Sequence, residues 1–214
     1  MRRVHLAILL AVLSTLTLAA PAAADTVGGP NGDRIVAGGQ FTFVDGSGQT
    51  YAASADVIDD HLADTVLISA SYFNSTTVTC PGDDPVDPSD DYEGSIETSF
   101  YAEAPTTSST FGSKLSSATA TGTVTGDITQ FNSCTGEQAV IGQDTIQVAI
   151  DLAATGAIDS SVGHTNTTDE QGNRYVVIFK TSERPAAGTI TFDGDAHDVE
   201  AVIRSEVWRT RPLG

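Results

Sequence analysis

Apolar and polar residues alternate along much of the chain, as they do in half-buried β-strands. The clearest case is residues 145–152, whose sequence TIQVAIDL places an apolar side chain at every second position. Residues 198–209 follow the same pattern, with apolar or small residues at the odd positions from Val199 to Val207. Because neighbouring side chains of a strand point to opposite faces, each segment predicts a strand that buries one face in a core.

Eight further segments are rich in β-branched or aromatic residues and are bounded by turn-forming residues. They are residues 40–44, 51–58, 65–73, 76–80, 95–104, 116–125, 174–181 and 189–193. The turn sequences are DGSG (45–48), DEQGN (169–173) and DGD (193–195), which are typical of hairpins. Residues 57–63 interrupt the alternation and predict a single helical turn.

These elements predict an all-β fold with about 9–11 short strands, arranged as an antiparallel β-sandwich or, as the alternative, a closed β-barrel. We expect a single all-β domain over residues 35–214, because this length suits one core. Residues 25–34 contain glycine, proline and asparagine, so we expect them to form a flexible lead-in.

The N-terminus has the features of a secretory signal peptide. Arg2 and Arg3 precede an apolar run over residues 6–19, and small residues follow it up to Ala24. The run is shorter than the roughly 20 apolar residues that a transmembrane helix needs. We therefore expect residues 1–24 to be removed, and the mature protein to be secreted, extracellular and not inserted in a membrane.

The chain is strongly acidic, with 28 Asp and Glu residues against 10 Lys and Arg residues. Removing residues 1–24 takes away two arginines and leaves a net formal charge of −20. Such a charge disfavours nucleic acid and anionic membranes as partners, because both are bound through cations. Residues 35–173 carry 20 acidic residues and one basic residue, whereas residues 174–214 carry six of each. An acidic face that recruits cations or a basic partner is one interpretation; a solubilising charge is the other, and we favour it.

Cys80 and Cys134 are the only cysteines. An even number of cysteines in an exported protein predicts one disulfide. In the chain-entropy model, a bond that closes a loop of about 55 residues stabilises the fold by roughly 4 kcal/mol. The large separation and the absence of a CxxC motif argue against redox or metal chemistry.

The segment CPGDDPVDPSDDYEG (80–94) combines six carboxylates with three prolines. Calcium takes about six to eight oxygen ligands, so the segment is a candidate calcium site. Its spacing is not that of an EF-hand. In a loop that starts at Asp87, Tyr92 occupies the sixth position, where an EF-hand requires glycine. A solvated loop is the alternative that we favour, so we expect no cofactor unless this loop binds calcium. The candidate ligands are Asp83, Asp84, Asp87, Asp90, Asp91 and Glu93.

Other chemistry has weaker support. The sequence DGDAHD (193–198) offers three carboxylates and His197 to a metal, but Asp193-Gly194 is more typical of a hairpin turn. Two dispersed carboxylates could form the catalytic pair of a hydrolase, yet no catalytic motif is present and no catalytic residue is assigned. Trp208 has the opposite parity to Ile203, which predicts an exposed ring that could stack on a sugar.

Residues 119–195 contain the sequences ATGTVTG, DLAATGAI and SERPAAGTITFDG. In these sequences the chain resembles a group of uncharacterised secreted β-rich proteins of high-GC Gram-positive bacteria. The resemblance covers about 40 per cent of the mature chain. It implies secretion and an all-β domain, and it implies no activity.

Three functions follow as hypotheses. The first is a secreted, non-enzymatic β-domain with a structural or binding role outside the cell, whose extracellular ligand is unknown. The second is a calcium-stabilised extracellular domain that uses the acidic residues 83–93. The third is a secreted hydrolase with dispersed carboxylates.

Overall fold

The computed structural model describes residues 31–82, 91–168 and 171–213. Within them lie ten β-strands and one 3-10 helix. The strands are β1 (Gly32–Val44), β2 (Thr50–Asp60), β3 (Thr65–Cys80), β4 (Tyr92–Pro105), β5 (Ser108–Phe111), β6 (Ser117–Asn132), β7 (Glu137–Ala154), β8 (Asp159–Thr168), β9 (Arg174–Phe192) and β10 (Asp195–Pro212). The helix η3 (Ser113–Leu115) precedes β6. No helix of the described residues is long and apolar enough to cross a membrane.

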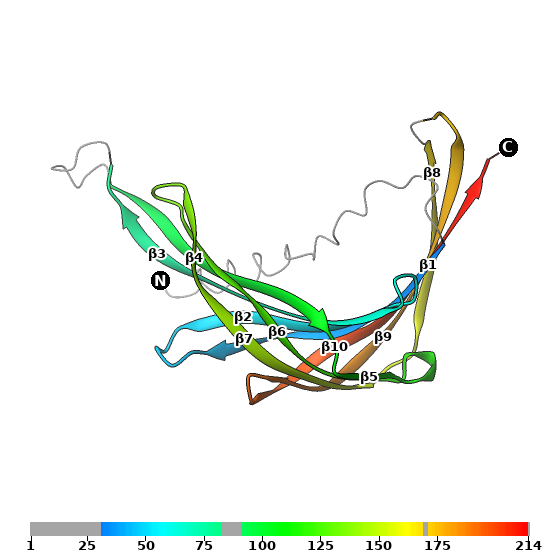
Figure 1. Ribbon diagram of the computed structural model, residues 1–214, viewed down its shortest axis with the longest axis horizontal. Coiled ribbons are helices and arrows are strands. Elements are labelled where there is room, and N and C mark those ends of the chain that lie inside the picture. The colour runs from blue at the N-terminus through cyan, green and yellow to red at the C-terminus, as the bar shows by residue number, and fades with distance from the viewer. Residues whose placement is uncertain (1–30, 83–90, 169–170, 214) are drawn as a thin grey trace, which may run out of the picture.

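The strands form one antiparallel sheet in the order β10-β1-β2-β3-β4-β6-β7-β9-β8. Because β9 also pairs with β10, the hydrogen bonds run through a ring of eight strands. β8 is attached outside the ring to β9, and the short β5 is attached to β6. Figure 1 shows that the sheet bends, with β3 and β4 rising at one end and β8 and the C-terminal end of β10 rising at the other.

The core lies on the inner face of the sheet, which is the side that points into the ring. Alternate residues of each ring strand are buried there, and the largest are isoleucine, leucine and valine. The fully buried members include Val57, Ile68, Val124, Ile146, Ile150, Leu152, Ile190 and Ile203. Aromatic rings cluster at one part of this core, with neighbouring centroids 5.0 to 5.8 Å apart. These are Phe41, Phe43, Tyr51, Tyr72, Phe100 and Phe192.

The predicted all-β antiparallel fold is confirmed, and so is the approximate number of strands. The prediction of short strands is wrong: β9 has 19 residues and joins two segments that the sequence separates at Pro185 and Gly188. Pro185 is tolerated because the pairing of β9 with β7 ends at Ala186, so no β7 carbonyl needs its missing N–H. The strands belong to one sheet, whereas a sandwich has two.

Three local expectations also differ. Residues 65–73 and 76–80 form the single strand β3. The predicted helical turn at residues 57–63 is absent, because β2 continues to Asp60 and a turn follows. The Asp60 carboxylate accepts hydrogen bonds from the backbone of Leu62 and Ala63, which stabilises that turn. β5 and β8 have no counterpart among the predicted strands.

Candidate ligand-binding surface

Beyond the ring, β8 and the adjoining ends of β9 and β10 form a three-stranded extension, which we call the C-terminal wing. It consists of β8, residues 174–181 of β9 and residues 207–212 of β10. The wing projects to one side of the molecule in Figure 1. In the wing, β9 and β10 pair without a register shift from the pair Thr181–Glu206 to the pair Tyr175–Pro212. The two faces of the wing can therefore be assigned residue by residue.

One face of the wing gathers basic residues. Lys180 pairs with Val207, Arg209 with Ile178 and Arg211 with Val176 across β9 and β10, and these residues share the face of the ring core. Arg174 belongs to the same face of β9 by its even number. We call the set Arg174, Lys180, Arg209 and Arg211 the basic face. All four residues are exposed.

Apolar side chains lie between these cations. Val162 of β8 is 70% exposed and is paired with Lys180, and His164 is paired with Ile178. Val176, Ile178 and Val207 are partly buried. The basic face is therefore amphipathic, with an apolar floor that continues the inner face of the ring and a cation in each successive row of residues.

The acidic residues nearest the wing, Glu183 of β9 and Glu206 of β10, point to the other face. Glu206 accepts a bond from Arg34 Nε at 2.6 Å and lies 3.0 Å from Arg204 Nε, while Glu183 lies 3.8 Å from Arg204 Nη1. Within the described ranges, ion pairs are formed by Arg34, Arg204 and His61. The cations of the basic face thus have no carboxylate partner among these residues.

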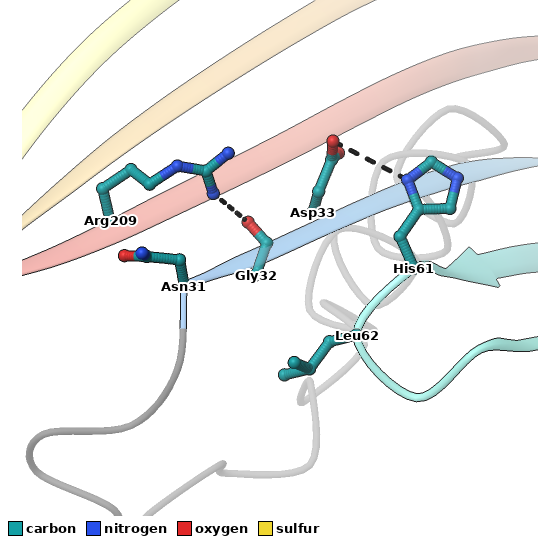
Figure 2. A pocket seen from close by; sticks show the side chains of 6 residues that line it. All are labelled: Asn31, Gly32, Asp33, His61, Leu62 and Arg209. Carbon is teal, nitrogen blue, oxygen red and sulfur yellow. Dashed lines mark hydrogen bonds and ion pairs between the residues drawn. The ribbon is translucent and has the colours of Figure 1, made fainter.

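A pocket of about 320 Å³ lies beside the basic face (Figure 2). Its lining residues are Asn31, Gly32, Asp33, His61, Leu62 and Arg209. Arg209 Nη1 donates to the carbonyl oxygens of Gly32 at 3.0 Å and Trp208 at 2.9 Å, which fixes the guanidinium at the pocket wall.

His61 connects two strands at this pocket. Its Nε2 lies 3.1 Å from the Asp59 carboxylate and its Nδ1 lies 3.7 Å from the Asp33 carboxylate. Both contacts are favourable together only when both ring nitrogens carry a proton. Partial burial opposes the imidazolium, but Asp59 and Asp33 outweigh it and raise the pKa of His61 above its usual value.

The predicted calcium ligands fall mainly outside the described residues. Asp83, Asp84, Asp87 and Asp90 belong to residues 83–90, which the structure does not describe. Asp91 is exposed and accepts a hydrogen bond from the backbone of Gly82 at 3.2 Å, and Glu93 is exposed at the start of β4. In residues 31–82, 91–168 and 171–213, no group of three or more metal-binding side chains could hold an ion. The calcium site stays a prediction.

The predicted disulfide is confirmed between Cys80 and Cys134. It joins the end of β3 to the turn between β6 and β7. Gly94 lies against both sulfur atoms, and a side chain there would collide with Cys80 Sγ. The bond is consistent with an oxidising compartment.

The predicted hairpin at Asp193-Gly194 is also confirmed. Asp193 has φ 51° and Gly194 has φ 93°, and they join β9 to β10 as a two-residue turn with both central residues at positive φ. His197 stacks on Phe41 with ring centroids 4.5 Å apart. Its Nε2 is buried and has no hydrogen-bond partner in the described part of the chain.

Trp208 is half-buried on the outer face rather than fully exposed, because its ring covers Gly32. The Arg34 guanidinium lies 6.0 Å from the ring centroid. Among the other aromatic residues, Tyr92 is 50% and Tyr101 is 56% exposed.

Nothing in the sequence pattern predicts an unusual carboxyl at Asp56, which lies on the outer face of β2. Burial raises the pKa of Asp56 to about 6, and the nearby Arg204 guanidinium opposes the shift. The carboxylate leans over Gly38 of β1, where a Cβ atom would collide with it. Asp56 does not line the pocket at His61 or the second pocket, which lies along Thr121–Thr123 and Gln147.

No protein-family model, curated protein or solved structure matches this chain.

Proposed function

We propose that the protein is an extracellular binding domain that holds an acidic, extended ligand on the basic face of the C-terminal wing. The observation that carries this proposal is the gathering of Arg174, Lys180, Arg209 and Arg211 on one side of the wing, without carboxylate partners among the described residues. Four cations in neighbouring rows repel one another, and an anionic ligand removes that cost.

The spacing suits an acidic peptide segment. Residues two apart on a strand are separated by about 6.5 Å, and the alternate side chains of an extended peptide have the same separation. Carboxylates at alternate positions of such a peptide can therefore meet one row of cations after another. The apolar floor formed by Val176, Ile178 and Val207 supports contact with the aliphatic parts of the same side chains.

The overall negative charge does not prevent this binding. At physiological ionic strength the Debye length is about 8 Å, so an exposed charge is governed by its near neighbours. The basic face extends from Lys180 to Arg174, and six residues of β9 span about 20 Å. One carboxylate, Asp33, lies beside Arg209 at the pocket, and His61 is 3.7 Å from it. A ligand on this face therefore experiences the four cations more strongly than the carboxylates elsewhere on the molecule.

The exterior location is part of the proposal. The Cys80–Cys134 disulfide supports an oxidising compartment. The signal-like residues 1–24 support export, although they lie outside the described residues. The calcium-stabilised domain remains the alternative, and its test is the thermal midpoint with calcium and with a chelator.

The binding test uses a fluorescent ten-residue peptide of alternating Glu and Thr, titrated with the protein and followed by anisotropy. The wild type should bind it, and binding should weaken as salt is added. Lys180→Gln/Arg211→Gln should weaken binding roughly 2- to 30-fold, since exposed charge pairs contribute about 0.2–1 kcal/mol each.

The matched control is Lys114→Gln, which removes an exposed positive charge from η3, outside the basic face. It should leave the affinity unchanged, and an uncharged peptide of alternating Gln and Thr should not bind. The proposal is wrong if the wild type fails to bind the acidic peptide at low salt, or if the double variant binds it as tightly as the wild type.

A further inference from the structure

β8 is the terminal strand of the sheet, and within the described residues its outer edge is free along its whole length. Its ten residues pair with β9, and no second partner strand is present among the described residues. Every residue of β8 except Thr167 is exposed. A strand of this kind presents an unpaired row of backbone N–H and C=O groups on its outer side.

The β8 edge lacks the usual protection against pairing. Its sequence DSSVGHTNTT contains no lysine, arginine or proline, and its only carboxylate is Asp159 at one end. Other edges of the sheet are guarded by the common devices. β5 has only four residues, and the part of β7 that lies beyond its pairing with β9 carries a bulge and the charged Glu137 and Asp144.

We propose that β8 pairs antiparallel with β8 of a second copy of this chain, so that two sheets join through their C-terminal wings. A strand edge is complementary to its own antiparallel copy, because each presents both donors and acceptors. The wing also projects at one end of the molecule, which leaves β8 at its periphery (Figure 1). The proposal is independent of the acidic ligand.

The faces of β8 determine the register. Val162 shares the face of Lys180, whereas Asp159 shares the opposite face with Glu183. Two copies form a continuous sheet when residues of the same face lie opposite each other. Antiparallel pairing about Gly163 satisfies this condition: Val162 lies opposite His164, and Ser161 lies opposite Thr165. Pairing about His164 also sets residues of the same face opposite each other, but it places the His164 imidazoles of the two copies against each other.

The net charge of the chain opposes association, but the β8 edge itself carries little charge. The whole chain has a formal charge of −18, so two copies repel over most of their surfaces. Apart from Asp159 at one end of β8, the nearest formal charges are the cations Arg174 and Lys180 on β9, which repel their copies in the second wing. Pairing about Gly163 sets Asp159 opposite Thr167, so no two carboxylates meet. Added salt should therefore strengthen this dimer by screening the remaining repulsion.

The contact is small for a permanent dimer. A standard interface buries about 800 Å² on each partner, and a single strand edge provides less. The dimer should therefore be weak and dependent on concentration. Sedimentation velocity over a concentration series, with the protein expressed from its full-length chain and recovered after any processing, should show a monomer–dimer equilibrium that shifts toward dimer as salt rises from about 0.1 to 1 M.

Two charged variants test the register. Ser161→Glu/Thr165→Glu places two pairs of like charges opposite each other in the dimer and should weaken it roughly 2- to 30-fold, as should Ser161→Lys/Thr165→Lys, since each cross-strand pair contributes about 0.2–1 kcal/mol. A one-to-one mixture of the two variants should form a heterodimer, because each Glu then faces a Lys. Both positions are exposed, so the fold should tolerate the changes.

The control Thr123→Glu/Ala153→Glu adds the same charge at exposed positions of β6 and β7 and should dimerise like the wild type. A wild type that stays monomeric at every concentration and salt level would overturn the proposal. So would a Ser161→Glu/Thr165→Glu variant that dimerises normally, or a mixture that forms no heterodimer.

Discussion

At the residue scale, Asp56 is the clearest case of a side chain whose surroundings change its chemistry. Its carboxyl has a pKa of about 6 in the folded chain against a reference value of 3.8. The folded state therefore binds the proton more tightly than the unfolded state, and stability falls as pH rises from about 4 to above 6. A shift of about two pKa units corresponds to roughly 3 kcal/mol, as an upper value for a group with some exposure.

Asp56→Asn removes this ionisation. The variant should be more stable than the wild type at pH 7, by up to about 3 kcal/mol, and the difference should vanish near pH 4. Urea unfolding at the two pH values measures it, with Asp151→Asn on the exposed face of β7 as the control. A variant that is no more stable than the wild type at pH 7 would contradict the burial of the Asp56 charge.

His61 should have the opposite pH dependence. Its raised pKa means that the charged imidazole, held between Asp33 and Asp59, stabilises the folded state. This contribution is fully present below the reference pKa of 6.5 and is lost as pH rises through the folded value. His61→Gln should therefore be less stable than the wild type at pH 5.5 and equally stable at pH 9. Asp59→Asn should reduce the stability that the charged His61 contributes at pH 5.5. If His61→Gln lowers the stability equally at pH 5.5 and pH 9, the ion pairs do not stabilise the fold.

At the element scale, the disulfide joins the β3–β4 hairpin to the β6–β7 hairpin beyond the last β4–β6 pair, Ile96 and Asn132. Cys80 ends β3, and Cys134 lies in the turn that joins β6 to β7. Cys80→Ser/Cys134→Ser should lower the free energy of unfolding by about 2–4 kcal/mol, because the unfolded chain regains the entropy of an open loop. Thermal unfolding of the variant should match that of the reduced wild type. A variant as stable as the oxidised protein would show that the bond does not stabilise the fold.

The two-residue turn at Asp193-Gly194 determines which side chains of β9 and β10 share a face of the sheet. It pairs Phe192 with Asp195, so even-numbered residues of β9 share a face with odd-numbered residues of β10. Lys180 and Arg209 are brought to one face by this register. The sequence contained the signal, since the hairpin was predicted correctly. The sequence predicts separate strands at residues 174–181 and 189–193, however, so the register of the hairpin does not extend through Pro185 from the pattern alone.

At the scale of the whole molecule, the distribution of charge matters more than its sum. The formal charge of −18 correctly describes the average surface, and it favours solubility. The pleat of β9 and β10 nevertheless places Glu183 and Glu206 on one side of the sheet and the basic face on the other. The two proposed contacts of the wing have opposite salt dependence, so one salt series distinguishes ligand binding from dimerisation.

The sequence by itself determined the all-β class, the approximate strand number, the hairpin at Asp193-Gly194 and the pairing of Cys80 with Cys134. These features depend on local periodicity, on backbone preferences of glycine, or on there being only two cysteines. The tertiary structure decided the ring of eight strands, the length of β9, the burial of Asp56 and the free edge of β8. Each of these depends on which distant strands become neighbours, and hydrogen bonding between strands carries no local signature that one sequence can reveal.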